Sequence, residues 1–243
     1  MSNLSIGTWM SLPNVSIAEI FAKTGYEWIV IDLEHSAISI NQAEKLIRVI
    51  DLAGSKPLVR LSGHSSSQIK RVLDAGAAGI IAPMVNTQED GKNIIEACFY
   101  PPNGIRGMGL ARAQGYGIPQ LRDQYLHKDN LDIEIYFQIE SEQAVENIEK
   151  IFELPINGYF IGPYDLSASL GDPGNFKSDK FIKAETRVMS AAEDRALKKG
   201  FHLVEPILTE LKDLEKRGYN KIAFSVDIRM LHSIAALPFL KSE

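Results

Sequence analysis

The sequence lacks several features that would point to particular classes of protein. Cys98 is the only cysteine among 243 residues, so a disulfide framework within the chain and a metal site built from several cysteines are both excluded. This cysteine lies in an apolar, helix-like stretch, where a small buried hydrophobe is the favoured interpretation. The net charge is -5 and no long basic run is present, which argues against a nucleic-acid partner.

Long hydrophobic runs are also missing. No apolar stretch reaches the roughly 18 residues that cross a bilayer, and the N-terminal Met1-Ser2-Asn3-Leu4 has neither the basic nor the apolar region of a signal peptide. We therefore expect no membrane partner and a cytoplasmic location. A hydrophobic content of 45% supports one sizeable core, and no linker divides the chain, so we expect a single domain over residues 1–243.

What the sequence does contain is a regular alternation of strand-like and helix-like segments. Apolar residues recur at helical spacing between short apolar runs, and glycines at positions 25, 54, 76, 200 and 218 are expected to close helices. Eight such alternations predict an α/β fold, a single (β/α)8 TIM barrel, with an open doubly wound sheet as the alternative. The expected strands are Ile6 to Trp9, Trp28 to Asp32, Pro57 to Leu61, Gly79 to Pro83, Ile133 to Ile139, Gly158 to Ile161, Phe201 to Val204 and Lys221 to Phe224.

Two carboxylates stand at the ends of strand-like runs. Glu140 and Asp165 are 25 residues apart, about one strand–helix–strand unit, so in a parallel barrel they meet at the same rim. Two hard oxygen ligands suit an ion of the magnesium or manganese type. The alternative is that each acid caps the helix that follows it.

Further polar residues converge on the same rim, where barrel enzymes carry their active sites. They are Asp32, Glu34, His35, Arg60, Gln138, Glu205 and Asp227. His35, flanked by acids, is a candidate general base, and Arg60 could instead form an ion pair at the rim. Asp227 is interpreted as a cap, and His202, within a strand, as a packed residue. Lys56 and Lys221 begin their strands, at the wrong end for a Schiff base, which favours a metal-assisted reaction.

Several motifs together resemble a known family. They include GTW at 7–9, IDLEHS at 31–36, LVRL at 58–61, FQIE at 137–140 and FIGPYDLSASLG at 160–171. In these segments the chain is similar to the class II, metal-dependent pyruvate aldolases of the 4-hydroxy-2-oxo-heptane-1,7-dioate aldolase family. The resemblance implies cleavage of a 4-hydroxy-2-oxo acid to pyruvate and an aldehyde, with a divalent metal ion (Mg2+, Mn2+ or Co2+) that stabilises a pyruvate enolate.

The resemblance also implies roles for individual residues. Glu140 and Asp165 would bind the metal, His35 would be the acid and base, and Asp74 would be its partner. Arg60 would face the ketone oxygen of pyruvate. The pyruvate pocket would be lined by Trp9, Gln138, Gly162, Pro163 and Tyr164. Relatives form homo-oligomers, hexamers in particular, with a C-terminal helix exchanged between subunits, and we expect the same here.

The chain departs from its relatives on the aldehyde side. Phe201-His202-Leu203-Val204-Glu205-Pro206 replaces a glycine-rich segment, and Ser225 precedes the terminal Val226-Asp227 where a glycine is usual. The aldehyde therefore stays undetermined, and Glu205 is expected to add an unusual charge near the site. Two other functions stay open: a citramalyl- or malyl-CoA-type lyase, and a catalytically silent barrel used as a binding module.

Overall fold

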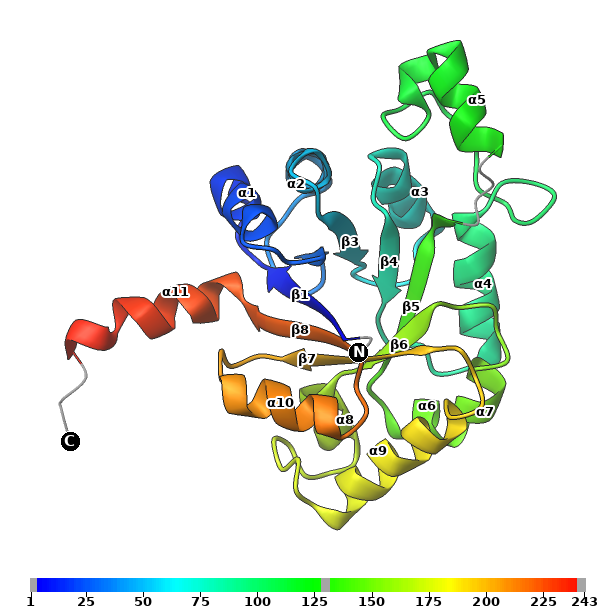
Figure 1. The fold of residues 1–243 in the computed structure, drawn as a ribbon. Coiled ribbons are helices and arrows are strands. Elements are labelled where there is room, and N and C mark those ends of the chain that lie inside the picture. Colours follow the sequence, from blue (N-terminus) through cyan, green and yellow to red (C-terminus); the bar gives the residue numbers. More distant parts are fainter. Residues whose placement is uncertain (1–3, 128–131, 240–243) are drawn as a thin grey trace.

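The computed structural model describes residues 4–127 and 132–239. Eight parallel strands pair in sequence order, and β8 pairs with β1, so the sheet closes into a barrel (Figure 1). This confirms the predicted (β/α)8 fold and excludes the open sheet. The strands are β1 (Ser5–Met10), β2 (Trp28–Asp32), β3 (Lys56–Arg60), β4 (Gly79–Ala82), β5 (Glu134–Ile139), β6 (Gly158–Ile161), β7 (Lys198–Leu203) and β8 (Lys221–Val226).

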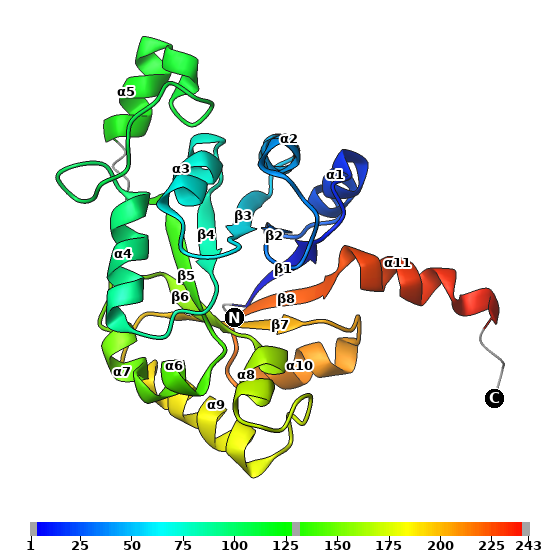
Figure 2. The ribbon, with the colours of Figure 1, turned by 180° about the vertical axis from the view of Figure 1, so that it is seen from behind.

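Helices connect the strands and surround the barrel on its outer side (Figure 2). Within the described ranges none of them is both long and apolar enough to cross a membrane. The α-helices are α1 (Val15–Lys23), α2 (Ile40–Leu52), α3 (Ser66–Asp74), α4 (Gln88–Cys98), α5 (Pro119–His127), α6 (Glu142–Glu146), α7 (Ile148–Ile151), α8 (Pro163–Ser169), α9 (Asp179–Ala191), α10 (Leu208–Lys216) and α11 (Asp227–Ala235). Short 3-10 helices are η1 (Gly115–Gly117) and η3 (Leu237–Phe239).

Local sequence signals start and stop these helices. Ser39 before α2 and Thr87 before α4 each form a capping box with the residue three positions later, which satisfies backbone N–H groups that the first helical turn leaves free. Such a cap stabilises a helix by about 1 kcal/mol. Gly25, Gly54 and Gly76 follow helices with positive φ values of 106°, 101° and 97°, a conformation that glycine adopts without strain.

One predicted helix stop is wrong. Gly200 lies inside β7, which begins three residues before the expected strand, and pairs with Lys221 of β8. A side chain at this position would place its Cβ 2.4 Å from the carbonyl oxygen of Tyr159. Glycine is therefore needed here for close approach of neighbouring strands, which a reading of the sequence cannot distinguish from a helix end.

The barrel interior is filled by aromatic side chains. Phe160 of β6 makes edge-to-face contacts with Trp9, Trp28 and Tyr136, with ring centroids 5.6 to 5.9 Å apart. A second, larger apolar cluster lies between the strands and the helices and includes Cys98, whose burial raises the pKa of its thiol to about 12. The barrel is thus a packed core, and only its ends can hold a ligand.

Two segments project from the barrel in both views (Figures 1 and 2). One is the arm formed by the segment after α4 together with α5, held by Arg106, whose guanidinium bonds to Asp74 and Tyr125. The other is α11, which buries only Asp227 and leaves Ile228, Leu231 and Ile234 exposed.

Candidate active site

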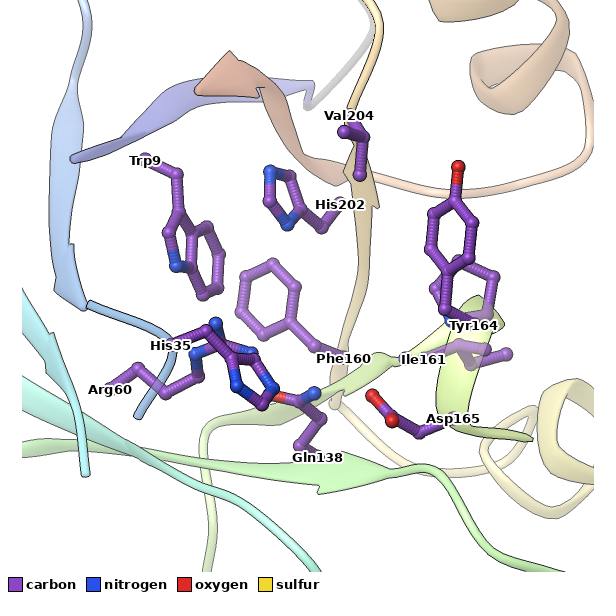
Figure 3. A pocket seen from close by; sticks show the side chains of 12 residues that line it. Trp9, His35, Arg60, Gln138, Phe160, Ile161, Tyr164, Asp165, His202 and Val204 are labelled. Atoms are coloured by element: carbon purple, nitrogen blue, oxygen red, sulfur yellow. The ribbon is translucent and has the colours of Figure 1, made fainter. Parts of the chain in front are cut away.

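A cavity of about 320 Å³ opens at the carboxyl ends of the strands (Figure 3). Eight of the ten predicted site residues line it, among them His35 at its mouth, and the other two are Asp74 and Glu140. The cavity is lined by Trp9, His35, Arg60, Gln138, Phe160, Ile161, Gly162, Pro163, Tyr164, Asp165, His202 and Val204. Glu140 is not part of the lining, but it is buried directly beside Gln138.

Arg60 is held in one orientation by two acids from the end of β2. Its Nε and Nη2 donate to the two carboxylate oxygens of Asp32 at 2.9 and 2.6 Å, and its Nη1 lies 3.2 Å from Glu34. Burial acts to raise the pKa of Asp32, but the bonds and the charge of Arg60 outweigh it and hold that pKa below its usual range. Arg60 is therefore both an ion-pair member and a cationic wall of the cavity.

Asp32 also shapes the turn that carries His35. Its carboxylate accepts the backbone N–H groups of Glu34 at 3.0 Å and His35 at 3.2 Å. The imidazole of His35 is exposed, and its Nε2 lies 3.8 Å from Glu34. Asp32 is thus a positioning residue that sequence reasoning placed at the rim without assigning it a role.

Asp74 lies elsewhere. It is the last residue of α3, close to the start of β4, and therefore at the opposite end of the barrel from the cavity. Its carboxylate accepts from Arg106 at 2.6 Å and from Gln114 at 3.0 Å. Within the chain Glu34 is therefore the carboxylate beside the imidazole, and the pairing of Asp74 with His35 stays a prediction.

The two predicted metal ligands do lie at the same rim. Glu140, at the end of β5, is 3% exposed and accepts the backbone N–H of Met84 at 2.6 Å. Burial, together with the charges of Glu34 and Asp165, raises the pKa of Glu140 to about 7. Asp165, in the first turn of α8, is exposed to the cavity.

Glycine at position 162 leaves the space that the side chains of Glu140 and Gln138 occupy. A Cβ at position 162 would lie 2.8 Å from the carboxylate oxygen Oε2 of Glu140 and 2.9 Å from the amide nitrogen of Gln138.

Neighbouring carboxylates repel each other unless a cation neutralises them, so this rim fits a divalent ion. In the described part of the chain no group of three or more His, Cys, Asp and Glu side chains could hold a metal. The protein would thus supply two carboxylates and leave the other positions open.

Several buried polar atoms beside the cavity have no hydrogen-bond partner. They include the indole Nε1 of Trp9 and the amide oxygen of Gln138, whose residues are 2% and 5% exposed. An unpaired buried polar group costs about 1–3 kcal/mol, so such atoms are common where a ligand completes them. One donor and one acceptor are therefore available for a polar ligand.

His202 is a cavity residue that sequence reasoning missed. Its ring stacks on the indole of Trp9 with 4.4 Å between centroids and 12° between planes. Burial, and next the charge of Arg60, lowers the pKa of His202 to about 4. The expectation of a packed histidine is met in part, but the ring also lines the cavity. The sequence gives no signal for the position of His202 in the cavity wall, because the residues of β7 that face inward depend on how the strand is aligned with its neighbours.

The remaining acids at the rim are structural. Asp227 is fully buried and accepts the backbone N–H groups of Ser11 at 3.0 Å and Leu12 at 2.8 Å, which fixes the segment after β1. Glu205 accepts from Arg229 at 2.9 and 2.8 Å and does not line the cavity described above. The expected extra charge is therefore neutralised by a salt bridge.

The fold and the cavity together define a (β/α)8 enzyme whose site combines an arginine, a histidine and two carboxylates. The chain belongs to the HpcH/HpaI aldolase/citrate lyase family, whose model matches residues 5–233. It is 38% identical over 228 residues to a 2-keto-3-deoxy-L-rhamnonate aldolase of Klebsiella pneumoniae subsp. pneumoniae, which covers 91% of this chain and 82% of that protein.

Solved structures agree with this assignment. An HpcH/HpaI aldolase/citrate lyase family protein from Burkholderia cenocepacia is 29% identical with a TM-score of 0.91, covering 98% of this chain and 94% of that chain. The HpcH/HpaI aldolase from Desulfitobacterium hafniense is 28% identical with a TM-score of 0.89, at 98% and 92% coverage. The predicted family and class of enzyme, a class II pyruvate aldolase among the carbon–carbon lyases, are confirmed.

Proposed function

We propose that the site cleaves a 4-hydroxy-2-oxo acid reversibly to pyruvate and an aldehyde, with the divalent ion held by Glu140 and Asp165. The observation that carries this proposal is that Arg60 and Asp165 line one cavity, while Glu140 lies buried directly beside the lining residue Gln138. When bound, an ion such as Mg2+, Mn2+ or Co2+ supplies Lewis-acid stabilisation of the negative charge that develops on the pyruvate half.

Arg60 contributes the second source of positive charge. Asp32 takes two of its five N–H donors and Glu34 forms an ion pair with Nη1, so donors stay free for the ketone oxygen of the substrate. Because these acids already fix the guanidinium, little reorganisation is needed as the enolate forms. Arg60 thus stabilises the transition state more than the bound substrate.

His35 is the proposed acid and base. As the C3–C4 bond breaks, the imidazole takes the proton of the C4 hydroxyl group, the aldehyde leaves, and a proton is then returned to C3 of the enolate. The exposed position of His35 at the cavity mouth allows it to reach C4, while Glu34 at 3.8 Å can balance the charge of the protonated ring.

The unpaired polar atoms and the small residues of the cavity orient the pyruvate half. The indole N–H of Trp9 can donate to a substrate oxygen, and the buried amide of Gln138 borders the same space. Gly162, Pro163 and Tyr164 complete the wall at the start of α8. Neither partner implied here is a macromolecule: the substrates are a small 2-oxo acid and an aldehyde.

We also propose that the active protein is a cytoplasmic homo-oligomer, a hexamer by resemblance, in which α11 packs on a neighbouring copy. Ile228, Leu231 and Ile234 of α11 are 46%, 51% and 69% exposed, and Phe239 beyond it is 85% exposed. Apolar side chains in this number are usually covered by another surface.

The alternative lyase acting on an acyl-CoA fits less well. A cavity of about 320 Å³ whose lining contains one arginine and no lysine suits a small oxo acid better than a large, multiply phosphorylated thioester. A catalytically silent barrel is also disfavoured, because the arginine, the histidine and both acids are placed at one rim.

Exchange of the methyl protons of pyruvate with deuterated water tests the proposal, because it reports enolate formation without an aldehyde. Nuclear magnetic resonance should show exchange with Mg2+, Mn2+ or Co2+, and chelator or Asp165→Asn should suppress it. Asp194→Asn, at an exposed carboxylate remote from the cavity, is the matched control. Exchange that continues unchanged in chelator would contradict the metal route, and no exchange with any of the three metals would contradict the aldolase activity.

A further inference from the structure

The wall of the cavity opposite Arg60 carries a histidine in an unusual setting. His202 lies flat against the indole of Trp9, as Figure 3 shows, while Arg60, Gln138 and His35 gather on the other side. In the proposed reaction, Arg60, Gln138 and the two acids act on the pyruvate half of the substrate. The wall left for the aldehyde half therefore consists of His202, Tyr164 and Val204.

The position of the imidazole is fixed through the end of β8. Its Nε2 lies 3.3 Å from the backbone carbonyl oxygen of Ser225. Ser225 is fully buried and has a positive φ of 61°, a conformation that costs energy for any residue other than glycine. Its hydroxyl donates to the carbonyl of Val204 at 2.8 Å, so the strained serine ties the ends of β7 and β8 together and aims its own carbonyl at the ring.

This contact determines which nitrogen carries the proton. A carbonyl oxygen can only accept, so Nε2 must be the donor. Because the pKa of His202 is lowered to about 4, chiefly by burial, the ring is neutral at physiological pH. In a neutral imidazole with a protonated Nε2, the other nitrogen, Nδ1, keeps its lone pair and is a hydrogen-bond acceptor.

Beyond this wall lies additional space. A second cavity of about 520 Å³, between α10 and the segment after α8, shares Tyr164, His202 and Val204 with the first. His202 therefore stands where an aldehyde chain would pass from the reacting carbon toward the larger space. Any polar substituent close to that carbon would meet the imidazole first.

We propose that His202 determines specificity for the aldehyde half, with its Nδ1 accepting a hydrogen bond from a hydroxyl group of the aldehyde, so that hydroxylated aldehydes are favoured over alkyl aldehydes. This inference rests on the proposed aldolase function. A site built around a substrate hydroxyl group discriminates against an analogue without it, because the site's own polar atom is then left unpaired.

The test is a ratio of kcat/KM values in the synthetic direction, with pyruvate and Mn2+ held constant. Glycolaldehyde and acetaldehyde serve as probes that differ by one hydroxyl group. His202→Phe keeps an aromatic ring to stack on Trp9 but removes both nitrogens, and we expect the glycolaldehyde-to-acetaldehyde ratio to fall about tenfold, the size of one hydrogen bond. His202→Gln, which again offers an acceptor, should restore part of the ratio.

Controls separate this inference from the proposed function. His232→Gln, at an exposed histidine of α11 that does not line the cavity, should give the wild-type ratio. If wild-type pyruvate exchange occurs but the ratio is the same in His202→Phe, the role of His202 is refuted while the aldolase function stands. If wild-type exchange never occurs, the proposed function itself fails. Should the Phe variant not fold, as judged by circular dichroism, His202→Leu gives the same comparison with His202→Gln.

Discussion

The two ends of the barrel both bury charged groups, but they treat them differently. At the amino end, Glu134 lies between Lys56 and Lys221, and the hydroxyl of Tyr136 donates to it at 2.6 Å. At the carboxyl end, the indole N–H of Trp9 and the amide oxygen of Gln138 have no partner, and Glu140 is crowded by other acids. Charged and polar groups that have partners stabilise the fold, whereas those without partners are available to bind a ligand.

The amino end also holds a buried lysine whose pKa is lowered. Lys221 lies over the rings of Trp28 and Tyr136 at 4.5 and 4.7 Å, and burial lowers its pKa to about 8. A lysine with such a pKa could serve as a nucleophile, but it stands at the far end of a barrel filled with aromatic side chains. Lys221 instead forms an ion-pair network with Glu134 and Lys56.

The largest expected effect is on Glu140, the proposed metal ligand. Glu140→Gln keeps the shape of the side chain but removes its charge, so pyruvate proton exchange should fall by about 10³-fold or more at saturating Mn2+. Isothermal titration calorimetry with Mn2+ should show weaker binding in the same variant. Wild-type metal affinity in Glu140→Gln would remove this residue from the site.

Replacement of Arg60 should lower the exchange rate less than replacement of Glu140. We expect Arg60→Lys to lower the exchange rate about 10²–10³-fold, because a lysine cannot keep the bidentate pair with Asp32 and still point free donors at the ketone oxygen. The loss should be in kcat more than in KM, since the contact strengthens in the transition state. A rate close to the wild-type value would show that Arg60 is only an ion-pair residue.

The raised pKa of Glu140 predicts a pH effect on the stability of the metal-free protein. The folded state holds this proton up to about pH 7, whereas the unfolded chain releases it near 4.5, so the free energy of unfolding should fall as pH rises between these values. The loss is at most about 3 kcal/mol. His202, with its lowered pKa, contributes the opposite slope below pH 6.5.

A comparison of urea unfolding for the wild type and Glu140→Gln in chelator isolates this contribution, because His202 is common to both proteins. The difference between their free energies of unfolding should change with pH between 5 and 7.5. A constant difference would mean that the carboxyl group of Glu140 is ionised throughout this range.

The smallest expected effect lies at the amino end. Lys221→Met removes a buried cation but leaves Lys56 beside Glu134, so the free energy of unfolding should fall by about 1–3 kcal/mol. Proton exchange per folded molecule should be retained, as measured below the melting temperature. A selective loss of activity with intact stability would break the distinction between the two ends.

Much of the site follows from short-range rules. Arg60, Gln138 and Glu140 could be placed because each sits at or just beyond the end of an apolar run, and the carboxyl ends of parallel strands share one rim. The same rule placed Lys56 and Lys221 at the other end. The predicted strand boundaries lie within a few residues of the observed ones.

Two contacts of the site that were not predicted share a cause. Asp74 is predicted to act with His35, and its bond to Arg106, 32 residues further along in a segment without regular structure, was not predicted. His202 is packed, as predicted, but its place in the cavity wall depends on Trp9 from the first strand and on a serine carbonyl from the last. Both cases depend on contacts between distant segments, which a local pattern does not contain.

The sequence by itself therefore determined the barrel, its family and the end at which the candidate site residues lie, because periodicity, caps and strand ends are local properties of the chain. Only the tertiary structure decided which acid stands beside His35, how Arg60 is held, and that His202 forms the wall facing it. These depend on strand register and on side chains brought together from opposite ends of the sequence, which a local pattern does not contain.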